Sequence, residues 1–76
     1  MVLRVYADPI APPCRAVLAF LALAKIDHEY IFINLQTGEQ QKPEFLAINP
    51  LGQVPVIQED DFTLSEPSAI LQYLAD

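Results

Sequence analysis

The spacing of hydrophobic and polar positions predicts alternating strands and helices in the first half of the chain. Residues 2–6 are β-branched and aromatic and end at Asp8-Pro9, which is typical of a short strand buried on both faces. Proline suits the first helical position, so a helix is expected over about 13–25, with apolar cover on more than one face. A second buried strand is expected over 28–35. Strand, helix and strand together indicate a crossover unit with parallel strands.

The second half of the chain predicts a hairpin and a last helix. Residues 39–48 are polar apart from three apolar anchors, so we expect a loop with one or two helical turns there. Strands are expected over 54–58 and 62–64, joined by an acidic, solvated turn at 59–61. Pro67 and the apolar positions after it predict a helix over 67–75. The order βαβ, a variable link and ββα indicates one α/β domain over residues 1–76.

Composition adds that this domain has apolar surface to cover. The chain has 76 residues, of which 53% are hydrophobic and 18% charged. A chain of this length is near the lower limit for a self-sufficient core, and such an apolar composition favours contact with another domain or subunit.

Charge and cysteine content exclude several classes of function. The formal net charge of −6 disfavours nucleic acid and anionic membranes as partners. One cysteine and one histidine provide neither a disulfide nor a zinc site, and they fit a reducing compartment. No apolar run is long enough to cross a bilayer and no leader pattern is present at the start, so we expect a cytoplasmic protein without a metal.

The turn at 49–56 is the most informative stretch. Proline at the head of a strand cannot donate a ladder hydrogen bond, and Pro55 also constrains Val54 to an extended conformation. Backbone groups are therefore left without a ladder partner, and an extended ligand could pair with them.

Three motifs together carry a resemblance to a known family. Pro-Cys-Arg-Ala-Val at 13–17, Asn-Pro-Leu-Gly-Gln-Val-Pro-Val at 49–56 and Leu-Ser-Glu-Pro-Ser-Ala-Ile-Leu-Gln-Tyr-Leu at 64–74 resemble the N-terminal domain of cytosolic glutathione transferases, of theta-like or bacterial type. The resemblance covers essentially the whole chain. It implies a thioredoxin-like βαβαββα fold with a four-stranded mixed sheet, flanking helices and a cis peptide bond between Val54 and Pro55.

The resemblance also implies a site for glutathione, the substrate of this family. Main-chain groups of Val54 would pair with the cysteinyl part of glutathione, Gln53 would contact the peptide, and Glu66 would face the γ-glutamyl ammonium. A carboxylate beside a helix start suits that role, because it can neutralise an amine. Gln40 and Lys42 match the loop that contacts the glycyl carboxylate, although a solvated lysine remains an alternative.

The family reaction is attack of the glutathione thiolate on an electrophile, and two departures affect it. Ala11 stands where theta-type enzymes have serine and beta- or omega-like ones cysteine, so it supplies neither donor nor nucleophile. Tyr6 lines up with the catalytic tyrosine of the alpha, mu and pi types, or it is a core or edge aromatic. Backbone amides at 11–14 are further candidate donors, although Pro12 and Pro13 lack an N–H.

Pro67 is the second departure, because the family has a serine there that binds the γ-glutamyl carboxylate. The amide of Ser68 could partly replace it, and we expect weak glutathione binding. Cys14 matches the second cysteine of a C-x-x-C motif whose first position is Ala11. A structural cysteine and a monothiol or glutathionylation role both remain open.

Three functions follow from the sequence. The first is the glutathione-binding half of a transferase, whose helical C-terminal, electrophile-binding domain is absent here. On this hypothesis the domain alone is a weak or inactive catalyst, and a longer parent protein is a homodimeric enzyme. The alternatives are a non-catalytic transferase-like interaction module and a glutaredoxin-like redox protein, which the missing first cysteine disfavours.

Overall fold

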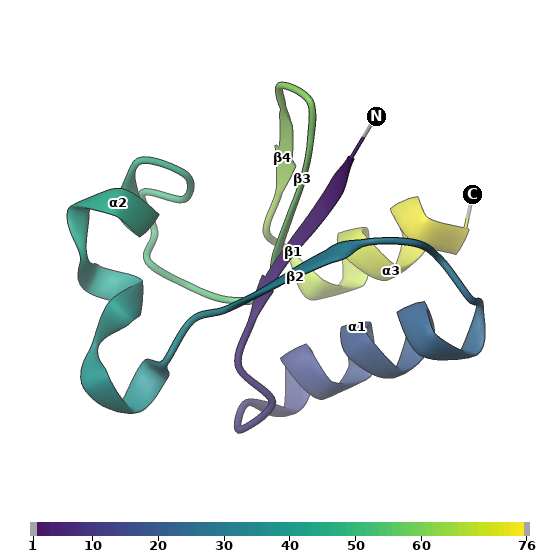
Figure 1. The fold of residues 1–76 in the computed structure, drawn as a ribbon, viewed down its shortest axis with the longest axis horizontal. Helices are drawn as coiled ribbons and strands as arrows, with labels where there is room; N and C mark the ends of the chain where they lie inside the picture. Colours follow the sequence, from purple (N-terminus) through teal and green to yellow (C-terminus); the bar gives the residue numbers. More distant parts are fainter. Residues whose placement is uncertain (1, 76) are drawn as a thin grey trace.

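The computed structural model describes residues 2–75, and it has the predicted order of elements (Figure 1). These elements are β1 (Leu3–Ala7), α1 (Pro12–Leu23), β2 (Glu29–Phe32), the 3-10 turns η1 (Leu35–Thr37) and η2 (Glu39–Gln41), α2 (Pro43–Leu46), β3 (Val56–Glu59), β4 (Phe62–Leu64) and α3 (Pro67–Ala75). The four-stranded sheet has the order β2-β1-β3-β4, with β1 and β2 parallel and the other pairs antiparallel. The predicted mixed sheet is confirmed.

Helices cover both faces of the sheet, and each face has its own hydrophobic cluster. In Figure 1, α1 and α3 lie on one side of the sheet and α2 on the other. Side chains alternate along β1, so Leu3, Val5 and Ala7 face α1 and α3 while Tyr6 faces α2. Cys14, Val17, Leu21, Ile57 and Ile70 complete the larger cluster, and Ile33, Phe45 and Val56 pack with Tyr6 in the smaller one.

The second strand is shorter and more exposed than the sequence predicts. It comprises Glu29–Phe32, and Tyr30 and Phe32 are 42% and 50% exposed. The prediction of a buried strand over 28–35 is wrong because β2 lies at the edge of the sheet, where it has β1 as its one neighbour. The third strand also begins later than predicted, at Val56.

Helix α1 is covered on one face within residues 2–75. Its buried residues are Cys14, Val17 and Leu21, whereas Leu23 is 84% exposed. The prediction of cover on more than one face is therefore not met by the described part of the chain, since α3 and the sheet reach one side of α1.

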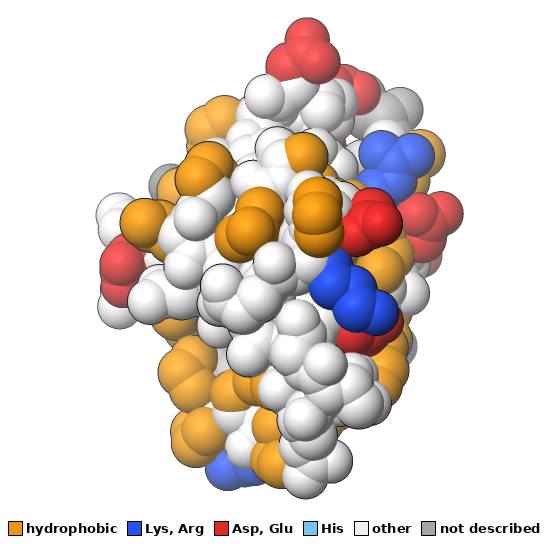
Figure 2. All heavy atoms as spheres, turned by 90° about the vertical axis from the view of Figure 1, so that its left-hand side faces the viewer, with side chains coloured by type: hydrophobic (Ala, Val, Ile, Leu, Met, Phe, Trp, Pro, Cys, Tyr) orange, Lys and Arg blue, Asp and Glu red, His pale blue; other side chains and the backbone are white. Residues whose placement is uncertain are grey.

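The surface on the α2 side is mixed in character. Figure 2 shows hydrophobic side chains at several places among polar and charged ones. Over residues 2–75, no helix has both the length and the apolar character needed to cross a membrane. No three acidic, cysteine or histidine side chains in this range are grouped to hold a metal ion.

Candidate functional site

A cleft of about 420 Å³ opens where the start of α1, the η1–η2 segment, the turn before β3 and the start of α3 meet. Five residues that the sequence predicted for the glutathione site line this cleft: Gln40, Gln53, Val54, Glu66 and Pro67. They come from three separate segments of the chain, and the fold brings them together.

The turn before β3 has a shape fixed by Asn49, which is 5% exposed. Its side-chain amide donates to the carbonyl of Gln53 at 2.9 Å, and its Oδ1 accepts from the N–H of Leu51 at 3.2 Å. Gly52 has a φ of +65°, and a Cβ there would lie 3.1 Å from the carbonyl oxygen of Gln40. Glycine therefore lets this turn approach the η2 segment closely.

Val54 presents an unpaired main chain to the cleft. The Val54–Pro55 peptide bond is cis, as the resemblance implies, and the β1–β3 ladder begins only at Val56. Among the backbone hydrogen bonds of residues 2–75, none involves the N–H or C=O of Val54. Pro55 itself is fully buried behind this edge.

Gln40 carries a second unpaired group. Its Oε1 is buried and has no hydrogen-bond partner among the described residues. A buried acceptor without a partner is costly.

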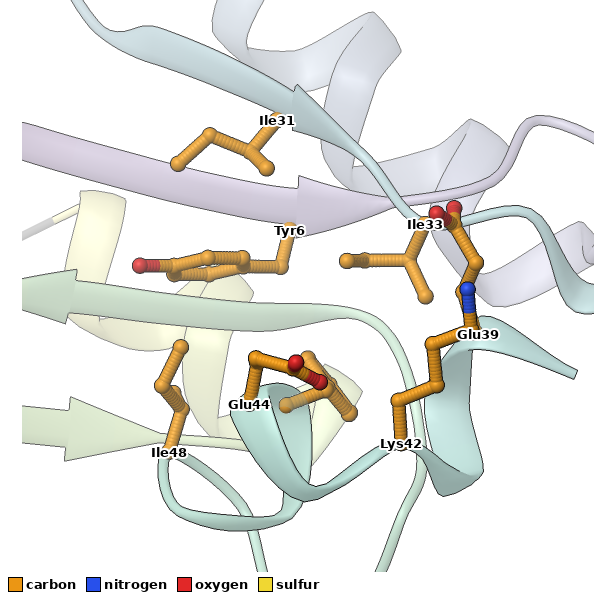
Figure 3. Close-up of a pocket in the computed structure, with 8 residues that line it drawn as sticks. Tyr6, Ile31, Ile33, Glu39, Lys42, Glu44 and Ile48 are labelled. Atoms are coloured by element: carbon orange, nitrogen blue, oxygen red, sulfur yellow. The ribbon is translucent and has the colours of Figure 1, made fainter.

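Two predicted binding residues lie outside the cleft lining. Lys42 caps the start of α2 and lies with Glu39 and Glu44 on the rim of a different depression (Figure 3). Ser68 is exposed in the first turn of α3, whereas Ser65 lines the cleft in its place.

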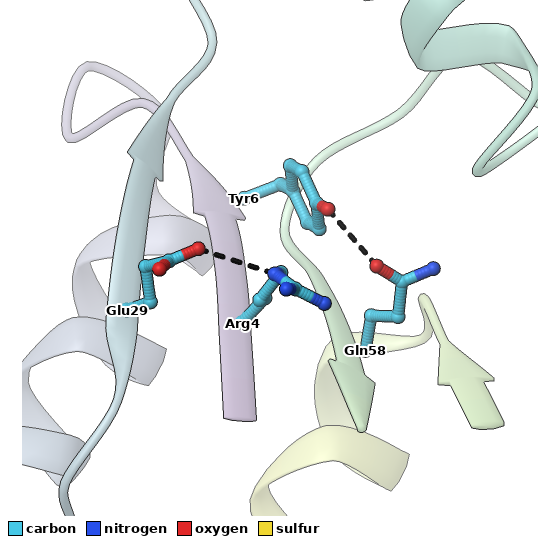
Figure 4. Close-up of polar contacts among 4 residues, drawn as sticks. All are labelled: Arg4, Tyr6, Glu29 and Gln58. Carbon is cyan, nitrogen blue, oxygen red and sulfur yellow. Dashed lines mark hydrogen bonds and ion pairs between the residues drawn. The ribbon is translucent and has the colours of Figure 1, made fainter. Parts of the chain in front are cut away.

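The side chain of Tyr6 also lies away from the cleft. It points to the α2 side of the sheet, where its hydroxyl donates to Gln58 Oε1 at 3.0 Å (Figure 4). Its ring packs edge-on against Phe45. It forms part of the lining of a separate pocket of about 350 Å³. This placement fits the core interpretation of Tyr6 better than the catalytic one. Nearby, Arg4 and Glu29 form an exposed ion pair at 3.1 Å.

Comparison with known proteins agrees with this geometry. The family model described as "Glutathione S-transferase, N-terminal domain" matches residues 1–76. The chain belongs to this family. It is 44% identical to glutathione S-transferase T1 of Arabidopsis thaliana and 39% identical to glutathione S-transferase theta-1 of Bos taurus, each over 99% of the chain. The solved structure of human glutathione transferase theta-2 in complex with glutathione matches with a TM-score of 0.95 and 40% identity over 96% of the chain.

These relatives are much longer than the chain. It spans 31% of the length of both transferases and 30% of the human structure. The match to the solved structure confirms the thioredoxin-like fold expected of a transferase N-terminal domain, and the relatives extend beyond the matched region.

The start of α1 in this transferase domain offers no free backbone N–H over residues 11–15. Ala11 is the N-cap and its N–H donates to the carbonyl of Asp8 at 3.1 Å. The N–H groups of Cys14 and Arg15 both donate to the carbonyl of Ala11, at 3.0 and 3.1 Å, and Pro12 and Pro13 have none. The backbone amides at 11–14, which the sequence left as candidate donors for the thiolate, are thus already engaged.

Cys14 has the environment of a structural cysteine. It is fully buried between α1, α3 and the sheet. Burial raises the pKa of its thiol above the usual 9.0, and this outweighs the lowering by a hydrogen bond with the Asp8 backbone. The thiol is protonated at neutral pH, so it lacks the reactive thiolate form.

Sequence reasoning missed several residues that line the cleft. These are Pro13, Leu35, Leu51, Gly52 and Ser65. Four of them are apolar or lack a side chain, so their types give no chemical signal. Ser65 directly precedes Glu66, and the motif at 64–74 was the signal that could have found it.

Proposed function

We propose that this domain binds glutathione in the cleft and forms the glutathione half of the active site in a longer glutathione transferase. The observation that carries the proposal is the unpaired main chain of Val54 beside Pro55. A peptide ligand in extended conformation can pair its own N–H and C=O with such a strand edge.

A carboxylate in the cleft lining supports the same ligand. Glu66 precedes α3, and its carboxylate suits the γ-glutamyl ammonium. Human theta-2 glutathione transferase, a structural neighbour, has been solved with glutathione bound.

Binding by this cleft is expected to be weak. Its lining contains no cation, because Lys42 lies elsewhere, and Pro67 has no N–H for the γ-glutamyl carboxylate. The amide of Ser68 is the nearest replacement along α3.

Thiolate activation is weaker still. Lowering the thiol pKa of glutathione from about 8.5 by about two units takes roughly 2.7 kcal/mol of preferential stabilisation. Ala11 has no hydroxyl, the backbone amides at the start of α1 are engaged, and Tyr6 lines a separate pocket, where its hydroxyl donates to Gln58. The domain alone therefore binds glutathione without activating it appreciably.

The longer protein would complete the enzyme. Its C-terminal region would bind the electrophile, and the homodimeric assembly and cytoplasmic location expected from the sequence belong to this same proposal. The exposed apolar residues of α1 fit a second structural partner.

A second candidate is a non-catalytic glutathione-binding module, which Ala11 favours. Calorimetric titration with glutathione and a conjugation assay with an aryl halide, using Glu66→Gln and the control Glu44→Gln, distinguish the cases. Glu44 lines the separate depression on the α2 side. Weaker glutathione binding in Glu66→Gln, with unchanged binding in Glu44→Gln, supports the cleft as the glutathione site. Turnover by the protein with its own Ala11 would exclude the non-catalytic module. Equal binding in both variants would refute the role of Glu66.

A further inference from the structure

The carboxylate of Asp8 links the loop after β1 to the start of η1. Asp8 has no role in the glutathione site as described so far. Asp8 follows β1 and is 6% exposed. Its Oδ1 accepts from the N–H of Ile10 at 3.0 Å, and its Oδ2 accepts from the N–H of Leu35 at 3.0 Å. Each oxygen therefore holds a different loop, and Leu35 is 27 positions away in the sequence.

Both loops carry walls of the cleft. Leu35 itself lines the cleft, and the loop of Ile10 leads directly to Pro13, which also lines it. Arg15 fixes the same loop by donating to the carbonyls of Pro9 and Ile10. The link from Asp8 to Leu35 thus ties the β1–α1 loop to the start of η1.

The buried Asp8 carboxylate depends on its two hydrogen bonds. A buried carboxylate without a cation is unfavourable, and no ion pair of Asp8 is found within residues 2–75. Two charge-assisted hydrogen bonds offset the desolvation and fix geometry at the same time.

We propose that Asp8 is a positioning residue for glutathione binding, because its two oxygens hold Leu35 and the loop before Pro13 in a fixed arrangement, and both Leu35 and Pro13 line the cleft. This inference rests on the proposed function. Asp8 does not line the cleft, so it acts through Leu35 and the β1–α1 loop.

The test is calorimetric titration of Asp8→Asn with glutathione, beside wild type and Asp61→Asn. Asparagine keeps one acceptor and turns an N–H donor toward the other amide, which breaks one link of the clamp. The control removes the same charge from the exposed turn between β3 and β4. We expect the dissociation constant to rise about five- to tenfold in Asp8→Asn alone, with changed NMR shifts for the amides of Ile10 and Leu35.

The outcomes separate the two proposals. If Asp8→Asn folds and binds glutathione with wild-type affinity, Asp8 is not a positioning residue, although the glutathione site still stands. Lower thermal stability without weaker binding is the result expected of a merely structural residue. Absence of binding by wild type would overturn both. If Asp8→Asn does not fold, Asp8→Glu makes the same test, because it keeps the charge but displaces both oxygens by one methylene.

Discussion

Replacing Gly52 by alanine perturbs the turn that presents Val54 to the cleft. Gly52 is buried with a φ of +65°, and an alanine Cβ would lie 2.8 Å from Gln41 Nε2 and 3.1 Å from the carbonyl oxygen of Gln40. The first contact involves the end of a flexible side chain and can be relieved by rotation. The second involves backbone, so the η2 segment must shift.

The expected loss of stability has two parts, the left-handed backbone at residue 52 and the contact with the Gln40 backbone. A left-handed backbone costs an L-residue roughly 1–2 kcal/mol relative to glycine, and overpacking against backbone costs about 1–3 kcal/mol. Gly52→Ala should therefore lower the free energy of unfolding by about 2–5 kcal/mol. Gly38 is a matched control, because its φ is +79° but a Cβ there meets nothing within 4 Å.

Urea denaturation followed by far-ultraviolet circular dichroism measures both variants, and the chain has no tryptophan for a fluorescence assay. Gly38→Ala should show the cost of the left-handed backbone alone. The difference in unfolding free energy between the two variants therefore measures the clash with Gln40. Because Gln40 lines the cleft, Gly52→Ala should also weaken glutathione binding. Equal destabilisation of the two variants would refute the steric argument.

Three further predictions address individual residues. Pro67→Ser restores an N–H and adds a hydroxyl at the start of α3, so calorimetry should show roughly fivefold tighter glutathione binding, and unchanged affinity would contradict the account. Tyr6→Phe removes the hydrogen bond to Gln58 and should cost about 1 kcal/mol of unfolding free energy while leaving glutathione affinity unchanged; lost affinity would restore Tyr6 to the site. The raised pKa of the Cys14 thiol makes the folded state bind its proton more tightly than the unfolded state. The stability that this proton binding adds to the folded state is fully present below pH 9 and is lost as the pH rises above it. Urea denaturation at a series of pH values should therefore show the free energy of unfolding declining above pH 9, and Cys14→Ala should reduce that decline.

The later elements of the fold are the best predicted from sequence, and local chemistry explains why. Phe62–Leu64 and Pro67–Ala75 have the predicted bounds, since an acidic turn and a proline at the first helical position mark where they begin and end. The strand Glu29–Phe32 was misjudged because its apolar run looks the same at the centre and at the edge of a sheet.

The candidate site was predictable for those residues that lie within a sequence motif of the family. Gln53, Val54 and Glu66 lie in contiguous motifs, and the structure brings them to one cleft. Lys42 lines a different pocket from the other predicted residues, so its contact with the glycyl carboxylate stays a prediction. Asp8 gave no signal, since its role depends on the amide of Leu35.

Amide NMR titration of the chain with glutathione decides whether the cleft is the binding site. We predict saturable shifts at Val54, Glu66 and Gln40, which line one cleft, with little change at Glu44, which lines a separate pocket. Absence of shifts at Val54 in millimolar glutathione, or shifts centred on the pocket beside Tyr6, would contradict it.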